Sequence, residues 1–404
     1  MKHVAILGWG VDTQDIVPWL KRQGDRVSVL DEKEKPFGDL TKYDILVRSP
    51  GVYRYRPEIL EAEKAGVVVT SKTKIFFDIC PGKIIGVTGT KGKGTTSSLI
   101  FEILKSAGKD VYLAGNIGHG MFGFVDKLGL DSWVVLELSS LQLIDLTKSP
   151  HIGVLLMTTV DHLDWHKDQN EYVQAKSNLL RFQGPGDFAV VNKDYVQCRK
   201  MAQGWLGKKI WISGKDWKGV LRIRGNHHRE NMAAAAAVAK IIGIKRPSVT
   251  QVAREFRGLE HRLEEVANID GVTYFDDSIS TVPETTIAAI KSFTEPVILI
   301  AGGSEKGSDF TVLGQEIAEA KSVKAVILVG LMASRIKQAI EAAGGRVKLL
   351  EGAKDMAEIV AQAREVAKRG DVVVLSPAAA SFDMFTSYKD RGDQFKQQVK
   401  ALQE

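Results

Sequence analysis

Residues 84–96 decide the fold of this chain, and they read Ile84-Ile85-Gly86-Val87-Thr88-Gly89-Thr90-Lys91-Gly92-Lys93-Gly94-Thr95-Thr96. A short apolar run ends in a loop rich in glycine and lysine, and a helix-like segment follows from Thr96 to Ser106. This order of strand, loop and helix suits a nucleoside triphosphate, because backbone N–H groups of the loop and the helix N-terminus point at phosphate oxygens. Such loops also occur as plain turns, but the flanking strand and helix patterns favour a phosphate-binding loop.

Two side chains in this loop have the chemistry for phosphates and Mg²⁺. Lys93 is placed to reach the β- and γ-phosphates, and a hydroxyl beside it is placed to hold the metal ion. The usual pattern has Ser or Thr directly after that lysine, but Gly94 stands there and Thr95 takes the role. The residues expected to bind ATP here are Gly89, Thr90, Lys91, Gly92, Lys93, Gly94, Thr95 and Thr96.

Composition limits the classes of protein to which the chain can belong. Its 404 residues are 44% hydrophobic and 26% charged, which leaves room for two or three cores. The net charge of +6 is spread along the chain, and no patch interleaves basic and aromatic residues. This pattern favours anionic small molecules over nucleic acid. Two cysteines, Cys80 and Cys198, exclude a disulfide framework and a zinc cluster.

The sequence also indicates where the protein acts. The chain enters a strand-like run at His3, with no basic leader followed by an apolar core. No apolar run approaches the roughly 20 residues that span a bilayer. We therefore expect a cytoplasmic protein that does not enter the membrane.

Strand-like and helix-like segments alternate along the whole chain, which predicts an α/β fold with parallel sheets. Three blocks are expected, at residues 1–78, 79–258 and 259–404: a Rossmann-like domain, a central P-loop ATPase-type domain and a second Rossmann-like domain. The expected strands are 3–8, 26–31, 45–47, 84–88, 133–138, 152–157, 188–192, 272–275, 297–301, 325–329 and 372–375, with helices at 16–23, 96–106 and 231–242.

The first block opens with a glycine turn after its first strand. Gly8-Trp9-Gly10-Val11-Asp12-Thr13 is followed about 20 residues later by Asp31, as in the dinucleotide fingerprint, but Thr13 replaces the third glycine. A plain βα turn and a hydride-transfer site both remain open, and the second nucleotide site in the next block disfavours a dehydrogenase. Ser49-Pro50-Gly51 ends another strand with small residues that allow a phosphate or sugar to approach.

Polar residues follow two strands of the second block. Glu137 ends one strand near the phosphate loop, where a carboxylate is well placed for Mg²⁺. Asp161-His162 follows the next strand, at the sheet edge where α/β proteins collect their ligands. Lys176 lies on an expected helix, and the residues alone favour a solvated helix lysine. His166 is expected to be structural.

A series of motifs runs through nearly the whole chain in a fixed order. They are SPG at 49–51, TGTKGKGT at 88–95, GNIG at 115–118, ELSSLQL at 137–143, DHLDWH at 161–166 with the downstream Lys176, GLEHRLE at 258–264, DDS at 276–278, GGSEKGSDF at 302–310 and SPAAASFDMF at 376–385. Their joint order resembles the Mur ligase superfamily, and the last three are most similar to its D-glutamate-adding branch.

This resemblance implies an ATP-dependent amide ligase in cytoplasmic peptidoglycan precursor synthesis. It would join D-glutamate to UDP-N-acetylmuramoyl-L-alanine through an acyl phosphate, using ATP and two Mg²⁺ ions, as a monomer. The implied catalytic residues are Lys93, Glu137, His162 and Lys176. Thr95, Glu137 and His162 would bind Mg²⁺, and Lys176 would react with CO₂ to give a carbamate that bridges the metal ions.

The resemblance also implies three sets of binding residues. Asn231, Arg262 and Asp277 would hold the adenine, ribose and phosphates of ATP. Gly10, Val11, Asp12, Asp31 and Ser49 would hold the uridine diphosphate, and Asn116 the sugar-peptide part of that substrate. Thr281, Lys306, Ser381 and Tyr388 would hold the incoming amino acid.

The chain departs from the superfamily pattern at several of these motifs. Gly94 after the loop lysine is closer to folylpolyglutamate synthetases, whereas the nucleotide-like first block argues against a folate ligase. Ile279 stands where a lysine is usual, Val282 where an asparagine is usual, His228 replaces the first asparagine of the adenine-side motif, and Tyr388 replaces a phenylalanine. Another ligase of the superfamily and a nucleotide-binding homologue with impaired catalysis therefore remain alternatives.

Overall fold

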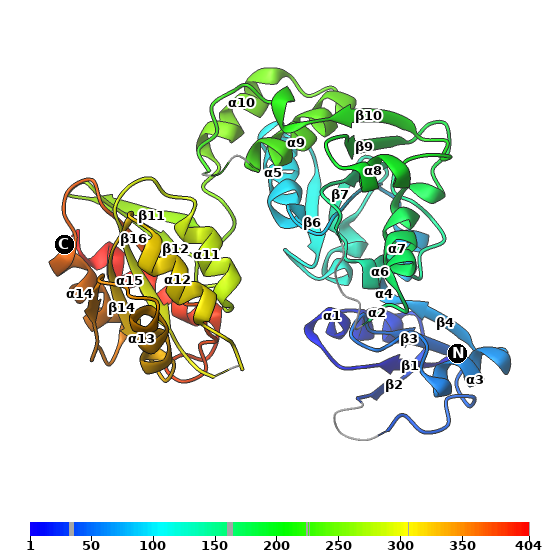
Figure 1. Cartoon of the computed structure of the whole chain (residues 1–404). Coiled ribbons are helices and arrows are strands. Elements are labelled where there is room, and N and C mark those ends of the chain that lie inside the picture. The colour runs from blue at the N-terminus through cyan, green and yellow to red at the C-terminus, as the bar shows by residue number, and fades with distance from the viewer. Residues whose placement is uncertain (32–35, 160–164, 224, 226, 306, 404) are drawn as a thin grey trace. The chain divides into compact units, whose positions relative to one another are not determined.

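The computed structural model describes residues 1–31, 36–159, 165–223, 225, 227–305 and 307–403 (Figure 1). Two expected site residues, His162 and Lys306, lie outside the described residues. The chain divides into two compact units, Met1–Phe256 and Arg257–Glu404. The division at residue 78 between a first and a second domain remains a prediction.

The first unit begins with a four-stranded parallel sheet in the order β2-β1-β3-β4, drawn in blue in Figure 1. Its strands are β1 (His3–Leu7), β2 (Arg26–Leu30), β3 (Ile45–Arg48) and β4 (Val68–Ser71). The helices of this segment are α1 (Val11–Gln14), α2 (Ile16–Arg22), α3 (Pro57–Lys64) and α4 (Lys72–Ile79).

The rest of the first unit is built on a six-stranded parallel sheet in the order β10-β9-β8-β5-β7-β6. Its strands are β5 (Lys83–Thr88), β6 (Val111–Gly115), β7 (Trp133–Glu137), β8 (Ile152–Leu155), β9 (Phe188–Asn192) and β10 (Lys208–Ile212). Its helices are α5 (Lys93–Ser106), α6 (Ser140–Leu143), α7 (Gln169–Arg181), α8 (Val196–Met201), α9 (His228–Ile242) and α10 (Arg246–Glu255), with short 3₁₀ turns η1 (Met121–Gly123), η2 (Val125–Lys127) and η3 (Gly214–Asp216).

Both faces of this central sheet are covered, which explains the apolar composition of its strands. On one face Ile85 and Val87 of β5 pack in a buried cluster with Leu99 and Ile103 of α5. On the other face α7 approaches β5 at Gly86, where an added Cβ would lie 2.8 Å from Leu179 Cδ1. The glycine therefore lets α7 approach the strand that leads into the phosphate loop.

The second unit has a mixed six-stranded sheet in the order β11-β12-β16-β13-β14-β15, in which only the β11–β12 pair is antiparallel. Its strands are β11 (Glu264–Ile269), β12 (Val272–Asp276), β13 (Val297–Gly302), β14 (Val323–Val329), β15 (Lys348–Leu350) and β16 (Val372–Leu375). Its helices are α11 (Pro283–Ile290), α12 (Thr311–Glu319), α13 (Ala333–Ala342), α14 (Met356–Val366) and α15 (Tyr388–Ala401).

The structure confirms the α/β class and corrects several expected elements. Helix α5 begins at Lys93 and not at Thr96, and α9 begins at His228 and not at Asn231. Five strands were not expected from the sequence: β4, β6, β10, β11 and β15. Among the described helices, none combines the length and the apolar character that crossing a bilayer requires.

Candidate active site

The phosphate loop lies at the carboxyl edge of the central sheet, where ligands of open α/β sheets bind. It connects β5 to α5, and Gly92 precedes the helix in a left-handed conformation, with φ of +87°. An added Cβ on Gly92 would lie 2.4 Å from Oδ1 of Asn231, a residue of α9. The structure therefore brings the expected nucleotide residue Asn231 against this loop, and only glycine fits there.

Two lysines converge on the phosphate loop. Lys93 Nζ donates to the carbonyl oxygens of Gly89 at 3.1 Å and of Thr90 at 3.2 Å. Lys176 Nζ donates to the same Gly89 oxygen at 3.0 Å and to Thr88 Oγ1 at 3.4 Å. Two cationic groups thus lie at the point where an anionic ligand of the loop would bind.

The interpretation of Lys176 as a solvated helix lysine is wrong, because its side chain is only 2% exposed. The sequence held a signal that could have shown this. Tyr172, Ala175 and Leu179 of α7 are buried, and their spacing of three and four residues defines one helix face. Lys176 lies on that face, so an amphipathic pattern drawn through the helix would have placed it inward.

Sequence reasoning missed Tyr172 of α7, which is 1% exposed and contacts both the phosphate loop and Lys176. Its hydroxyl lies 2.9 Å from Thr90 Oγ1 in the phosphate loop. Lys176 Nζ lies 4.9 Å from the centre of its ring, a cation–π distance. Tyr172 therefore connects α7 to the phosphate loop.

Hard oxygen donors occur at the same edge of the sheet. Glu137 ends β7 with 7% exposure, and Thr95, in the first turn of α5, is 4% exposed. The N–H of Asn116, which follows β6, donates to the Glu137 main-chain oxygen at 3.1 Å. A carboxylate and a hydroxyl are ligands that Mg²⁺ accepts, so these two residues fit a magnesium ion.

His166, which was expected to be structural, is buried. Its Nε2 lies 3.0 Å from Ser140 Oγ, and its Nδ1 lies 3.4 Å from Glu171 Oε2. His166 as a whole residue is 3% exposed, and its ring packs edge-on against the ring of Tyr172.

The first sheet presents its own carboxyl edge with the expected UDP residues. Ser49 is 8% exposed, and its N–H donates to Leu7 O at 2.9 Å, which places the SPG turn beside the glycine turn after β1. Thr13 stands in place of the third glycine, and its Oγ1 donates to the carbonyl oxygens of Gly8 and Gly10, each at 3.1 Å. Its hydroxyl therefore fixes the turn. Asp31 follows β2 directly, and β2 pairs with β1 at this edge.

In the second unit, two loops and the start of α15, which carry expected amino-acid ligands, are joined by hydrogen bonds. Ala378 N–H donates to Ser280 O at 2.9 Å, which connects the Thr281 loop to the Ser381 loop. Ser278 Oγ donates to Tyr388 O at 2.8 Å. Thr281, Ser381 and Tyr388 thus lie on connected segments at one edge of this sheet.

Arg391 of α15 holds these segments together, and sequence reasoning missed it. It is 2% exposed, and its Nε and Nη2 donate to Ser278 Oγ at 2.9 Å and Ser278 O at 2.8 Å. Nη1 donates to the carbonyl oxygens of Ala379 and Ala380. Burial lowers the pKa of Arg391 to about 10, so the group remains a cation at neutral pH.

The two expected nucleotide residues of the second unit differ in their surroundings. Arg262 is exposed. Asp277 is 3% exposed and accepts hydrogen bonds from Ser280 Oγ at 2.6 Å, Ser376 Oγ at 2.7 Å and Leu263 N at 3.1 Å. Burial nevertheless raises the pKa of Asp277 to about 6 from its usual 3.8.

We expect Asp277 to make the second unit more stable in mild acid than at neutral pH. The folded pKa lies above the unfolded one, so this contribution is present below pH 3.8 and is lost as pH rises through 6. The pKa difference corresponds to about 3 kcal/mol of unfolding free energy over the whole titration, of which about half is lost between pH 5 and pH 8. Urea unfolding of the full chain at pH 5 and pH 8, with Asp277→Asn as the reference, measures it. An equal pH dependence in both proteins would contradict the assignment.

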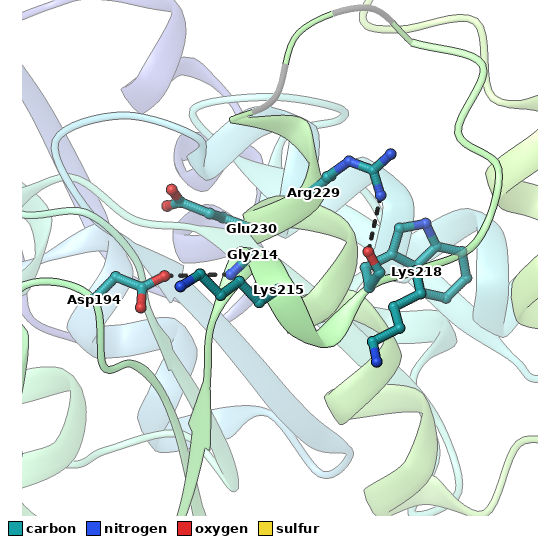
Figure 2. Close-up of a pocket in the computed structure, with 7 residues that line it drawn as sticks. Asp194, Gly214, Lys215, Lys218, Arg229 and Glu230 are labelled. Carbon is teal, nitrogen blue, oxygen red and sulfur yellow. Dashed lines mark hydrogen bonds between the residues drawn. The ribbon is translucent and has the colours of Figure 1, made fainter.

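An open cavity of about 560 Å³ lies near the start of α9, at the ends of β9 and β10 (Figure 2). Figure 2 shows Asp194 accepting a hydrogen bond from Gly214 N, at 3.3 Å. Glu230 is the chain neighbour of Asn231 and binds Asn192 Nδ2 at 2.8 Å. A residue of the cavity wall is thus the chain neighbour of the expected nucleotide residue Asn231. It is lined by Asp194, Gly214, Lys215, Trp217, Lys218, Arg229 and Glu230.

Comparison with known proteins gives the same family that the motifs indicate. Residues 87–217 match the Mur ligase middle domain, and residues 261–379 match the Mur ligase, glutamate ligase domain. The chain is 35% identical to the UDP-N-acetylmuramoylalanine--D-glutamate ligase of Clostridium kluyveri, with 98% of this chain and 96% of that protein covered. It is 36% identical to the protein of the same name from Acetivibrio thermocellus, with 100% and 97% covered.

Among solved structures, the MurF ligase from Thermotoga maritima in complex with ADP shares the fold. The TM-score is 0.58 at 16% identity, with 99% of this chain and 95% of that chain covered. The identity to the D-glutamate ligases over nearly the whole of both chains is far higher. The chain therefore belongs to the Mur ligases, in the family of the UDP-N-acetylmuramoylalanine--D-glutamate ligases.

Proposed function

We propose that this protein joins D-glutamate to UDP-N-acetylmuramoyl-L-alanine in an ATP-dependent reaction of cytoplasmic peptidoglycan precursor synthesis. The observation that carries the proposal is the convergence of Lys93 and Lys176 on the Gly89 carbonyl of the phosphate loop. A buried lysine beside a phosphate loop is not needed for nucleotide binding alone. The names of the full-length relatives support the choice of substrates.

The reaction has two steps, and its atoms balance without an additional reactant. A carboxylate oxygen of UDP-N-acetylmuramoyl-L-alanine attacks the γ-phosphorus of ATP, and the bond to the bridging oxygen breaks to give an acyl phosphate and ADP. The amine of D-glutamate then attacks the acyl carbon, phosphate leaves and the amine loses a proton. Catalysis would consist of positioning and charge neutralisation by Lys93 and the N–H groups at the start of α5.

Thr95, Glu137 and His162 would hold Mg²⁺, and Lys176 as a carbamate would be a further ligand. The metal would supply positive charge that neutralises the phosphate oxygens. Thr95 and Glu137 supply the oxygen donors at the sheet edge. The carbamate would turn Lys176 from a cation that repels Mg²⁺ into an anion that binds it.

The remaining expected residues divide between the two substrates and ATP. Gly10, Val11, Asp12, Asp31 and Ser49 would bind the uridine diphosphate, and Asn116 the sugar-peptide part. Asn231, Arg262 and Asp277 would bind the nucleoside and phosphates of ATP. Thr281, Lys306, Ser381 and Tyr388 would bind D-glutamate.

An ADP-release assay with UDP-N-acetylmuramoyl-L-alanine and a panel of amino acids tests the proposal. We expect turnover with D-glutamate and little with L-glutamate or neutral amino acids. Turnover with a folate substrate in place of the UDP-sugar would instead favour a folate ligase. ATP binding without turnover on any substrate would favour a homologue with impaired catalysis.

Lys306→Ala is expected to raise the KM for D-glutamate at least about tenfold, equal to roughly 1.4 kcal/mol. D-Glutamate brings two carboxylates that need cationic donors, and Ile279 supplies no charge at its position. The KM for ATP should remain nearly unchanged. Steady-state kinetics with each substrate varied in turn measure both values. Equal rises in the KM for both substrates would indicate that Lys306 acts in the nucleotide site or supports the fold in general.

A further inference from the structure

We propose that Arg48, Arg54 and Tyr55 are positioning residues that fix the SPG substrate turn to two helices of the central sheet's segment: α6, which follows the strand that ends at Glu137, and α7, which carries Lys176. The inference rests on the proposed function, because it assigns the turn at Ser49 to UDP-substrate binding. The three residues flank Ser49-Pro50-Gly51, and their partners lie on or directly after α6 and α7. These contacts are all within the first unit.

Arg48 ends β3 and uses its whole guanidinium. Nη1 donates to Ser49 O at 3.2 Å and to Val52 O at 2.7 Å, so the side chain binds the main chain on both sides of Pro50-Gly51. Nη2 donates to Leu141 O in α6 at 3.0 Å and to Asp145 Oδ2 at 2.6 Å, and Nε donates to Asp145 Oδ2 at 3.2 Å. With the side chain 2% exposed, all five N–H groups therefore have an acceptor, as a buried cation requires.

Asp145 is the common partner of two arginines from the first sheet's segment. Its second oxygen, Oδ1, lies 3.2 Å from Arg54 Nε, and Arg54 also forms a fork with Glu63 of α3. The Asp145 side chain is only 9% exposed, so neutralising it would leave the buried guanidinium of Arg48 without its counter-charge and Arg54 with Glu63 alone. The cluster therefore needs the carboxylate to keep its geometry.

Tyr55 makes a second connection, to the helix that carries Lys176. Its hydroxyl donates to Glu171 Oε1 at 2.6 Å, in the first turn of α7. Burial, with the hydrogen bond to Glu171, raises the pKa of Tyr55 to about 12, so the hydroxyl remains a donor near neutral pH. The ammonium of Lys167 lies 3.5 Å from the centre of the same ring and encloses it further.

These contacts set the distance between the SPG turn and the phosphate loop. Helix α6 begins three residues after Glu137, and α7 places Lys176 against the phosphate loop. A UDP-sugar seated on the SPG turn must deliver its carboxylate to the γ-phosphate held by that loop. Fixing the turn to α6 and α7 sets this distance before the substrate binds, which lowers the free energy that binding must supply for alignment.

The test compares Asp145→Asn and Arg54→Met with wild type and with Arg22→Met. Arg22 is a matched control, since it also joins the first sheet's segment to the second through Asp126 at 2.6 Å, but both side chains are exposed and lie outside the cluster. We expect Asp145→Asn to raise the KM for UDP-N-acetylmuramoyl-L-alanine about tenfold and Arg54→Met about threefold. The KM for ATP and for D-glutamate should change less than about twofold, and Arg22→Met should match wild type.

Melting temperature and UDP binding by calorimetry accompany the kinetics. A lower melting temperature with unchanged KM, or parallel rises in all three KM values, would make the cluster merely structural and overturn the inference. If Asp145→Asn does not fold, Arg54→Met, whose side chain is 21% exposed, decides by the same criteria.

If the wild type releases no ADP from these substrates, the proposed function fails on its own and UDP binding decides the inference. Weaker UDP binding by Asp145→Asn than by wild type then supports it. Equal binding, or no binding by the wild type, overturns it.

Discussion

Lys93→Ala is expected to lose ATP turnover by a factor of about 10² or more while keeping its fold. Lys93 is the first residue of α5, and its ammonium lies over the phosphate loop within hydrogen-bond distance of Gly89 O and Thr90 O. Phosphate oxygens in the loop would take the place of those carbonyls. Without the lysine, the charge that develops on the transferred phosphoryl group would lose a preorganised cation.

ADP release measured at saturating substrates tests this expectation. Lys105→Ala is the matched control, since Lys105 is an exposed cation in the last turn of the same helix and should leave turnover unchanged. Circular dichroism and melting temperature separate lost catalysis from lost structure. A Lys93→Ala protein with wild-type turnover and an unchanged spectrum would refute the phosphate-loop assignment.

The central strands of the fold were predictable because they are buried on both faces. β9 (Phe188–Asn192) and β16 (Val372–Leu375) agree with the expected ranges to the residue, and both are short apolar runs flanked by turn residues. β11 and β15 lie at sheet edges and are only partly buried. β11 begins with Glu264 and Glu265, and β15 begins with Lys348. These charged residues interrupt the apolar runs from which strands were predicted.

Helix starts at the phosphate loop and at α9 were predicted three residues too late. At α5, Gly92 adopts a left-handed conformation and the helix begins with the following lysine, so Lys93 belongs to both the loop motif and the helix. Apolar periodicity begins only after Thr96, because the first turn of the helix consists of Lys93, Gly94, Thr95 and Thr96 and has no apolar side chain. A prediction from hydrophobic spacing therefore misses the first turn of the helix, which contains Lys93 and Thr95.

The candidate site was predictable where a residue's role is local and not where it depends on distant contacts. Lys93, Thr95 and Glu137 lie in or beside short motifs that can be recognised alone. Arg48 owes its role to Asp145, 97 residues away, and Arg391 owes its role to Ser278, 113 residues away. No local pattern contains such a pair, so only the folded structure could identify these buried arginines.

Lys176→Ala is expected to be nearly inactive, and short carboxylic acids such as formate or acetate should partly restore its turnover. The lysine is buried beside the phosphate loop, 3.0 Å from Gly89 O, on the inward face of α7. An unmodified ammonium there would repel Mg²⁺, whereas a carbamate formed with CO₂ would supply an anion that binds it. Truncation to alanine leaves space in which a small carboxylate can act as that anion.

Arg181→Ala provides the comparison, since Arg181 is an exposed cation at the end of the same helix and should keep full activity. Turnover is measured with and without added formate, and melting temperature shows whether α7 remains packed. If formate restores turnover to Lys176→Ala but not to Lys93→Ala, then the first variant lacks an anion and the second lacks a cation. If Lys176→Ala keeps more than about half of its activity, an effect well below 1.4 kcal/mol, the carbamate role is wrong. The lysine would then serve only to hold α7 against the Gly89 carbonyl of the phosphate loop.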